Sequence, residues 1–398
     1  MPHRLRLPVA VAAALVVAEA AVLLLRPRER YPVVPAEPRA YFSAAELERA
    51  DRFRSGQLWL FGARGVVELG VLVVAVRLAP RAGRRPVLTG AAVAVGIALA
   101  GTALALPLRA AARQRAKNVG LVTQSWGGWG VDVVKGTAIG GVFAAGGGAL
   151  LVVGMRRFGR DWWAPGAAAV VVLAVVFTYL GPVVLDPVFN KFTPLPAGST
   201  RSDVLELARR AGVGVGEVYS VDASRRTTAA NAYVTGIGRT KRVVLYDTLL
   251  KDFTPAETRL VVAHELGHVR FRDVPHGLLW LALIAPLVTL AVARGGERLT
   301  RPGTIAVPAV ALSLAVLAPA VTTIANQLSR AIERRADAFA LSLTGEPDAM
   351  VDFERRITVK NVGDPEPPRW QQVVLGTHPT TMERIGQALA TRGSRDGP

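Results

Sequence analysis

The segment His264-Glu265-Leu266-Gly267-His268 contains the residues best suited to chemistry in this chain of 398 residues. If the segment is helical, both histidines project from one face with Cβ atoms about 5 to 6 Å apart, so both imidazoles can bind one zinc ion. Glu265 then reaches a metal-bound water and acts as a general base. The alternative is a pair of surface histidines on a helix that binds no metal.

Three features favour the metal site. The chain has only five histidines, and two of them are in this segment. Thr254 is a helix-capping residue followed by proline, and Glu257 lies three residues after it, which predicts a helix that runs through about Arg270. Gly267 in the interior of that helix costs about 1 kcal/mol relative to alanine, which predicts the close approach of another element.

A catalytic zinc ion takes three protein ligands and keeps one open position. No third histidine follows at the short spacing typical of metzincins, so the third ligand must come from farther along the chain. Glu333 and Asp337 lie one turn apart in a segment with helical spacing, and we expect Glu333 to bind the metal. Asp337 would then accept a proton from a zinc-bound histidine. The alternative is salt bridges with Arg330 and Arg334. We predict one Zn²⁺ per chain.

The composition predicts a membrane protein, because 51% of the residues are hydrophobic and they are segregated into long runs. Each run is roughly long enough to cross a bilayer, which takes about 20 helical residues. The first run resembles a signal peptide, but it continues past a small-residue triplet at 18–20 and is interpreted as a retained anchor. The seven runs are 7–25, 58–79, 87–108, 137–155, 164–182, 277–293 and 304–324.

A formal charge of +18 would suggest nucleic acid as the partner of a soluble protein. Here arginines cluster beside the apolar runs, at 26, 28 and 30, at 81, 84 and 85, and at 156, 157 and 160. This pattern is typical of loops that face anionic lipid and fix topology, so we expect membrane lipid and no nucleic acid. The charge bias predicts an outside amino terminus and a cytoplasmic catalytic side. The excess of arginine over lysine and the abundance of Ala, Gly and Val are typical of a GC-rich bacterium, so we expect a bacterial plasma-membrane protein. The sequence has no cysteine, which excludes a disulfide framework and a thiolate metal site.

The polar segments form two blocks, 186–276 and 325–398, separated by a transmembrane hairpin at 277–324 and preceded by five spans and their loops at 1–185. We expect one peptidase domain interrupted by the hairpin. The first block predicts a helix at 200–210 and a small antiparallel sheet of strands at 217–221, 231–236 and 242–246. In the second block, the helix of the seventh span continues out of the membrane to Gly345.

Several further segments carry a family resemblance. Residues 186–195, 231–233, 242–250 and 329–337, and His378-Pro379 followed by Glu383-Arg384-Ile385, occur in the order found in the type I CAAX prenyl endopeptidases, which this chain resembles. That resemblance implies a mainly α membrane protein with seven transmembrane helices around a water-filled chamber. It also implies an embedded α+β zincin-like domain at the cytoplasmic rim of the chamber.

The resemblance also assigns roles to residues outside the zinc motif. It places Asn231, Ala232 and Tyr233 on a strand that pairs with extended substrate. It places His378 and Arg384 near the scissile carbonyl, where they bind substrate or developing negative charge. Taken alone, Asn231 would be a turn residue, His378 a loop residue and Arg384 a member of a surface ion pair.

The chain departs from the family pattern at two places. Asp273 stands where members often carry another histidine, and the next histidine is His276, whose role stays open. Thr380 replaces the usual second proline after His378, which is a mild change.

These features predict a membrane-embedded zinc endopeptidase that hydrolyses a peptide or protein substrate, with membrane-associated or lipidated proteins among the candidates. One alternative is a membrane-protein quality-control protease without a prenyl requirement. Another is a transporter or inactive scaffold with a structural zinc, which would have no need of Glu265 as a base.

Glu19 lies in the middle of the first apolar run, and Arg64 and Glu68 lie one helical turn apart in the second. A charge in hydrocarbon costs several kcal/mol, so we expect these side chains to line the chamber, with Arg64 and Glu68 paired on one helix face. The alternative is that Arg64 extends to the interface and Glu19 is protonated.

Overall fold

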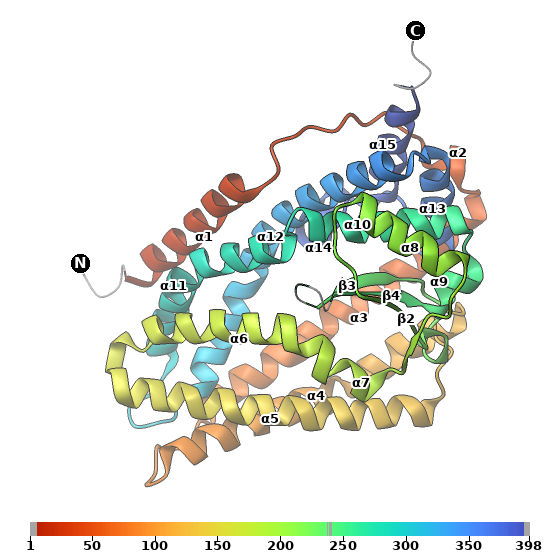
Figure 1. Ribbon diagram of the computed structural model, residues 1–398. Helices are drawn as coiled ribbons and strands as arrows, with labels where there is room; N and C mark the ends of the chain where they lie inside the picture. Colours follow the sequence, from red (N-terminus) through yellow and green to blue (C-terminus); the bar gives the residue numbers. More distant parts are fainter. Residues whose placement is uncertain (1–5, 237, 239–240, 394–398) are drawn as a thin grey trace.

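The protein is mainly helical in the computed structural model, which describes residues 6–236, 238 and 241–393 (Figure 1). Seven of the described helices are long and apolar enough to cross a membrane, and each overlaps one of the predicted runs. They are α1 (Arg6–Leu25), α3 (Ala44–Arg77), α4 (Pro86–Asn118), α5 (Trp126–Phe158), α6 (Trp163–Val184), α11 (Asp273–Leu299) and α12 (Val307–Thr344).

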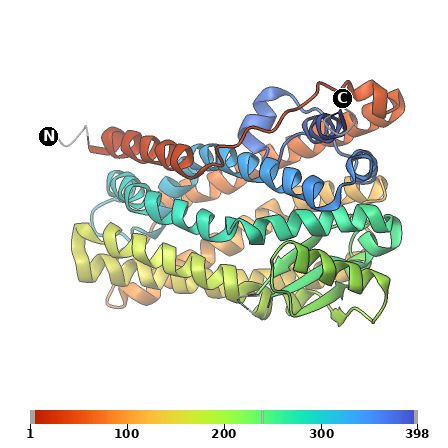
Figure 2. The same cartoon turned by 45° about the horizontal axis from the view of Figure 1, so that its top comes forward.

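The remaining elements are short and lie mostly at one end of the long helices (Figure 2). The helices are α2 (Pro38–Tyr41), α7 (Asp186–Phe189), α8 (Ser199–Arg210), α9 (Asp247–Asp252), α10 (Pro255–Arg270), α13 (Pro347–Lys360), α14 (Arg369–Leu375) and α15 (Thr381–Gly393). The strands are β1 (Phe192–Pro194), β2 (Glu217–Val221), β3 (Ala232–Thr235) and β4 (Arg242–Tyr246).

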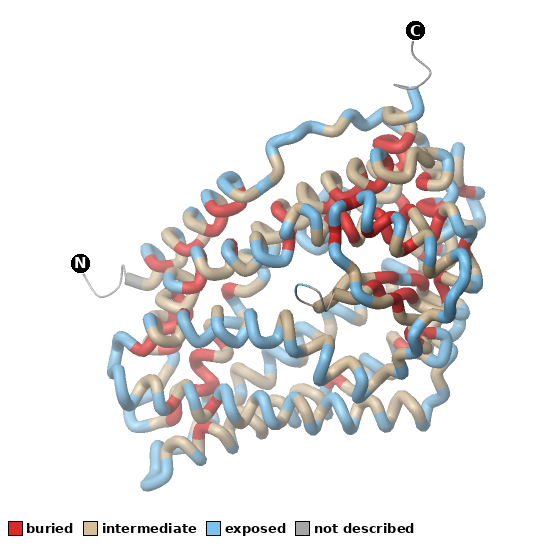
Figure 3. The backbone as a smooth tube through the Cα atoms, in the orientation of Figure 1, coloured by how far each residue is buried: buried red, intermediate tan, exposed pale blue. Residues whose placement is uncertain are grey.

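The long helices pack closely at some contacts only. Small residues allow α1 to lie against α11 and α12, where Ala14 and Ala18 are fully buried. By contrast, no residue in the most apolar part of α3 or α6 is buried (Figure 3). Helices packed on one side by protein would bury a stripe of residues. The absence of buried residues is instead consistent with lipid on one side of these helices and an open interior on the other, as in the fold class predicted from the sequence.

The sheet has the strand order β1-β2-β4-β3. The expectation of an antiparallel sheet is wrong in part, because β2 and β4 pair in parallel, while β3 pairs with β4 and β1 with β2 in the antiparallel sense. Strand patterning shows which face of a strand is buried but not its direction, and the chain passes through β3 before it returns as β4 beside β2. The edge strand β1 was not predicted, because it has three residues and ends in Pro194.

The two polar blocks share one hydrophobic core. Leu245 and Leu266 from the first block and Leu341 and Met350 from the second lie in the same buried cluster. The transmembrane hairpin formed by α11 and α12 therefore leaves this domain and returns to it. The domain lies at the end of the bundle where α6 ends and α11 begins (Figure 1).

Helix α10 begins as the sequence predicts. Thr254 Oγ accepts a hydrogen bond from the Glu257 backbone N–H, and the Glu257 carboxylate accepts one from the Thr254 N–H. The predicted close approach at Gly267 is also confirmed, because a Cβ there would lie 3.1 Å from Phe339 and 3.4 Å from the Cα of Ala336 on α12. The glycine therefore lets α10 and α12 approach closely enough for their polar side chains to meet.

Candidate metal centre

Three side chains from two helices converge on one point: His264 and His268 on α10, and Glu333 on α12. Their ligand atoms all lie within 4.8 Å of one another. The two histidine Nε2 atoms are 3.0 Å apart, and Glu333 Oε2 is 3.2 Å from His264 Nε2. Two imidazole nitrogens and a carboxylate at this spacing could hold a metal ion, and they are the types of donor that zinc takes in proteins.

A buried carboxylate orients each histidine through its other ring nitrogen. His264 Nδ1 is 2.8 Å from Asp337 Oδ1, and His268 Nδ1 is 2.9 Å from Asp273 Oδ2. Both aspartates are buried. Each carboxylate can accept a hydrogen bond from the Nδ1–H group, which leaves the Nε2 lone pair free for a metal. Asp337 takes the position expected from the sequence, whereas this role of Asp273 was not predicted.

The residues fit a zinc ion. Glu333 Oε2 is buried, and its close contacts among the described residues are ring nitrogens of histidines, so a cation held between them would satisfy it. Burial alone would lower the pKa of His264, but its hydrogen bonds with Asp337 and Glu333 outweigh burial and raise the pKa to about 10. A site that holds a proton this strongly also favours a metal cation in its place. Zinc bound by His264, His268 and Glu333 would supply Lewis acidity and make a bound water more acidic.

Glu265 lies beside this group and is not engaged elsewhere. Its carboxylate has no hydrogen bond to any other residue in the described parts of the chain, and its charge interacts with both histidines and Glu333. Burial raises the pKa of Glu265 above the ordinary glutamate value, although the two histidines oppose this shift. A carboxylate with a raised pKa accepts a proton more readily, as a general base requires.

Arg384 on α15 contacts Asp337, the carboxylate that orients His264. Its Nε and Nη2 are 2.9 and 2.6 Å from the Asp337 carboxylate, and its Nη1 is 2.6 Å from Glu354 Oε1. Burial disfavours the guanidinium charge, but Asp337 and Glu354 outweigh it and raise the pKa of Arg384. All three nitrogens are therefore committed to carboxylates, so this geometry suits a residue that positions Asp337 and, through it, His264.

His378 lies at the open side of the group. Its Nε2 is 3.5 Å from Glu333 Oε2, and its side chain is 58% exposed. The loop that carries it is held by α12 and α14, because Arg330 donates to the Gly376 carbonyl and Gln372 donates to the His378 carbonyl. His378 thus lies beside Glu333 and also faces solvent, where its ring N–H can donate a hydrogen bond.

The segment 231–233 lies at an edge of the sheet. Strand β3 pairs only with β4 among the described strands, so its other edge is open to an added strand. Asn231 is exposed, Ala232 is buried, and the Tyr233 hydroxyl is 3.4 Å from Asp186 Oδ2. Ala232 can therefore contribute only through its backbone.

The structure does not bring the ionisable residues of the spans into the metal-ligand group. Gln327 Nε2 on α12 donates to Glu19 at 2.9 Å. Arg64 Nε is 3.2 Å from Glu68 Oε1, and these side chains are 42% and 49% exposed. His276, near the start of α11, is also outside the group, and its Nδ1 is buried without a partner among the described residues.

Two supporting residues were missed at the sequence level, Asp273 and Glu354. The signal for Asp273 was present, since an aspartate stands at the family's histidine position five residues after His268. No local signal marks Glu354, which reaches the site only because α13 packs against α15. Burial raises the pKa of Glu354 to about 7, and Arg384 opposes the shift.

Comparison with known proteins agrees with this arrangement. Two family models match: peptidase family M48 over residues 194–392, and the CAAX prenyl protease N-terminal domain of five membrane helices over residues 34–191. Together with the seven apolar helices, the second match identifies an integral membrane protein.

Similar proteins include the uncharacterized metalloprotease YhfN of Bacillus subtilis, 34% identical over 59% of this chain and 58% of that protein. A probable CAAX prenyl protease 1 of Schizosaccharomyces pombe is 29% identical over 64% of this chain and 56% of that protein. The alignments thus span somewhat over half the length of these curated relatives.

The crystal structure of S. mikatae Ste24p has the same fold, with a TM-score of 0.75 and 20% identity over 98% of this chain and 99% of that one. The M48 model alone matches half of the sequence, including all three metal-binding candidates and their aspartate partners. The chain belongs to peptidase family M48.

Proposed function

We propose that this protein is a zinc-dependent endopeptidase embedded in a membrane. The observation that carries the proposal is the convergence of His264, His268 and Glu333 within 4.8 Å, with the uncommitted carboxylate of Glu265 beside them. A structural zinc site would have no use for an adjacent free base, whereas hydrolysis needs one.

In this proposal His264, His268 and Glu333 would hold the zinc ion, which would make a water more acidic. Glu265 accepts a proton from the water that attacks the scissile carbonyl and later passes that proton to the leaving amine. His378 donates a hydrogen bond to the carbonyl oxygen as negative charge develops there. The open edge of β3, with Asn231 and Tyr233 on either side of Ala232, holds the substrate as an added strand. Arg384 holds Asp337 and thus His264 in place.

The proposed substrates are peptides or proteins that reach the site from the membrane. The relatives named as CAAX prenyl proteases and the membrane helices support this class. A pair of peptides that share one sequence, one of them prenylated on a cysteine, tests the role of the lipid. Faster cleavage of the prenylated form would indicate processing of lipidated ends, and equal rates would indicate a prenyl-independent protease such as one for quality control.

Metal dependence tests the chemistry. Protein purified in neutral detergent should lose hydrolysis of a fluorogenic peptide when treated with a chelator and regain it when zinc is added back. Loss of activity without recovery on adding zinc, together with an unchanged thermal unfolding curve, would count against a catalytic zinc.

We also propose that the metal group faces the cytoplasm of a bacterial cell, because the domain and loops at that end carry the larger share of arginine and lysine. The chain has no cysteine, so single cysteines report topology cleanly. A cysteine at Gly83, in the loop between α3 and α4 at the opposite end, should react with a membrane-impermeant thiol reagent in spheroplasts made from intact cells. A cysteine at Ser199 should react only after lysis, and the reverse pattern would invert the orientation.

A further inference from the structure

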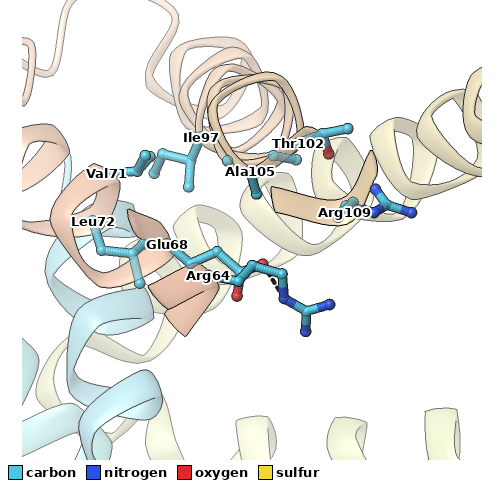
Figure 4. Close-up of a pocket in the computed structure, with 10 residues that line it drawn as sticks. Arg64, Glu68, Val71, Leu72, Ile97, Thr102, Ala105 and Arg109 are labelled. Carbon is cyan, nitrogen blue, oxygen red and sulfur yellow. Dashed lines mark ion pairs between the residues drawn. The ribbon is translucent and has the colours of Figure 1, made fainter. Parts of the chain in front are cut away.

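A groove between α3 and α4 has both charged and apolar walls (Figure 4). Its residues lie in a part of the sequence distant from His264, His268 and Glu333. Its cavity is about 400 Å³. Arg64 and Glu68 line it from α3, and Thr102 and Arg109 from α4, among small and aliphatic residues. Gly101 and Ala105 provide the room, because larger side chains there would fill the space between the two helices.

The same helix pair carries a second groove with a different character. This cavity, of about 430 Å³, is lined only by aliphatic residues, glycine and proline, including Val67, Val74 and Leu104. Both grooves include Val71 and Ile97, so they flank the same line of contact between the helices. Charged residues within membrane spans face the protein interior or water, whereas a wholly apolar surface suits lipid. The charged groove therefore faces the interior of the bundle.

The charges in the groove do not balance. Arg64 Nε pairs with Glu68 Oε1 at 3.2 Å, and Arg64 keeps its two terminal nitrogens for another acceptor. Arg109 has no hydrogen bond or ion pair with any residue that the structure describes, and Figure 4 shows its guanidinium at the open side of the groove. Two arginines against one glutamate leave one positive charge, which a single carboxylate would neutralise.

The groove lies well inside the bundle relative to the peptidase domain. Arg54 Nε on α3 donates to the Val362 carbonyl of that domain at 3.0 Å. Arg64 is ten residues farther along the same helix, which corresponds to about 15 Å. An extended peptide covers this distance in about five residues. A substrate that enters from the domain can therefore place a chain end at the groove.

We propose that the groove formed by Arg64, Glu68, Thr102 and Arg109 binds the carboxyl-terminal carboxylate of the peptide substrate. The inference rests on the proposed function, since it gives a substrate end to that site. Arg109 and the free nitrogens of Arg64 donate to the carboxylate, and Thr102 offers a hydroxyl. The apolar walls accept the side chains before it. The protein would then select peptides that end within its interior.

Binding to the zinc-loaded Glu265→Gln variant in neutral detergent tests this site without hydrolysis. The probe is a fluorescent Leu/Val-rich peptide with a free carboxyl end, compared by anisotropy with the same peptide ending in a carboxamide. We expect the free acid to bind about tenfold more tightly, as for a charge-assisted contact. Adding Arg109→Gln should reduce the preference below about twofold, while Arg109→Lys should retain most of it.

Arg77→Gln is the matched control, because Arg77 lies on α3 outside the groove, and it should keep the full preference. Equal binding of acid and amide, or a preference that survives Arg109→Gln, would overturn the inference. A third outcome would also overturn it: the acid and the amide peptide bind equally, and Arg109→Gln loses binding of fluorescent phosphatidylglycerol. That outcome would identify a site for a lipid headgroup. The binding assay uses the Glu265→Gln variant and needs no hydrolysis. Failure of the unmodified protein to hydrolyse any peptide would therefore refute the proposed function, while the acid-over-amide preference would still report on the groove.

Discussion

Replacing Asp273 by asparagine should weaken zinc binding although Asp273 does not touch the metal position. Asp273 Oδ2 lies 2.9 Å from His268 Nδ1, and the aspartate is 7% exposed. The substitution removes a charge-assisted hydrogen bond worth about 1.5 to 3 kcal/mol. At 1.4 kcal/mol for each factor of ten, zinc affinity should fall roughly 10- to 100-fold, as for other carboxylates that orient metal-bound histidines.

Competition with a chromophoric chelator measures this affinity in the folded protein. Asp273 also pairs with Arg335, so Arg335→Gln separates the two contacts and should change zinc affinity by less than about threefold. Asp132→Asn removes the aspartate of another partly buried ion pair, with Arg226, and should leave zinc affinity unchanged. An affinity of Asp273→Asn equal to that of the unmodified protein would refute the assigned role of Asp273.

The other predictions concern the same centre. Glu333→Ala should remove most of the bound zinc, and full zinc in this variant by metal analysis would mean that another residue is the ligand. Asp337→Ala should weaken zinc binding about 10- to 100-fold. Because the pKa of His264 is raised to about 10, zinc must displace a proton below that pH, so the apparent affinity should fall up to about tenfold for each unit from pH 8 to pH 6. A flat profile in chelator competition would contradict this displacement. Glu354→Ala removes one buried partner of Arg384 and should lower the unfolding free energy by about 3 to 5 kcal/mol. Glu354→Gln should cost less, because a glutamate with a pKa of about 7 is already partly protonated at neutral pH, and equal thermal shifts in the two variants would argue against this.

The parts of the site that depend on local spacing could be predicted from the sequence. The cap at Thr254 and the i, i+4 spacing of His264 and His268 fix a helix and one of its faces, whatever the rest of the chain does. Gly267 indicated a close neighbour, which the structure identifies as α12. The spacing of Glu333 and Asp337 places both on one face of that helix.

The parts that depend on the path of the chain could not be predicted. Asp273 reaches His268 because Arg272 adopts a left-handed backbone conformation, with φ of 57°, that ends α10 and turns the chain into α11. Arginine gives no sign of this conformation in a sequence. Glu354 and Arg109 have the same difficulty, because each meets its surroundings only through the packing of separate helices. The parallel pairing of β2 with β4 was missed for that reason too.

The most direct test of the account is the Glu265→Gln variant, assayed for zinc and for peptidase activity in the same preparation. The glutamine keeps the size of the side chain and removes only its ability to take a proton, so the three metal ligands are untouched. We predict one zinc per chain, an unchanged thermal unfolding curve and loss of nearly all hydrolysis. Retained hydrolysis in a zinc-loaded, folded Glu265→Gln protein would contradict the claim that Glu265 is the general base.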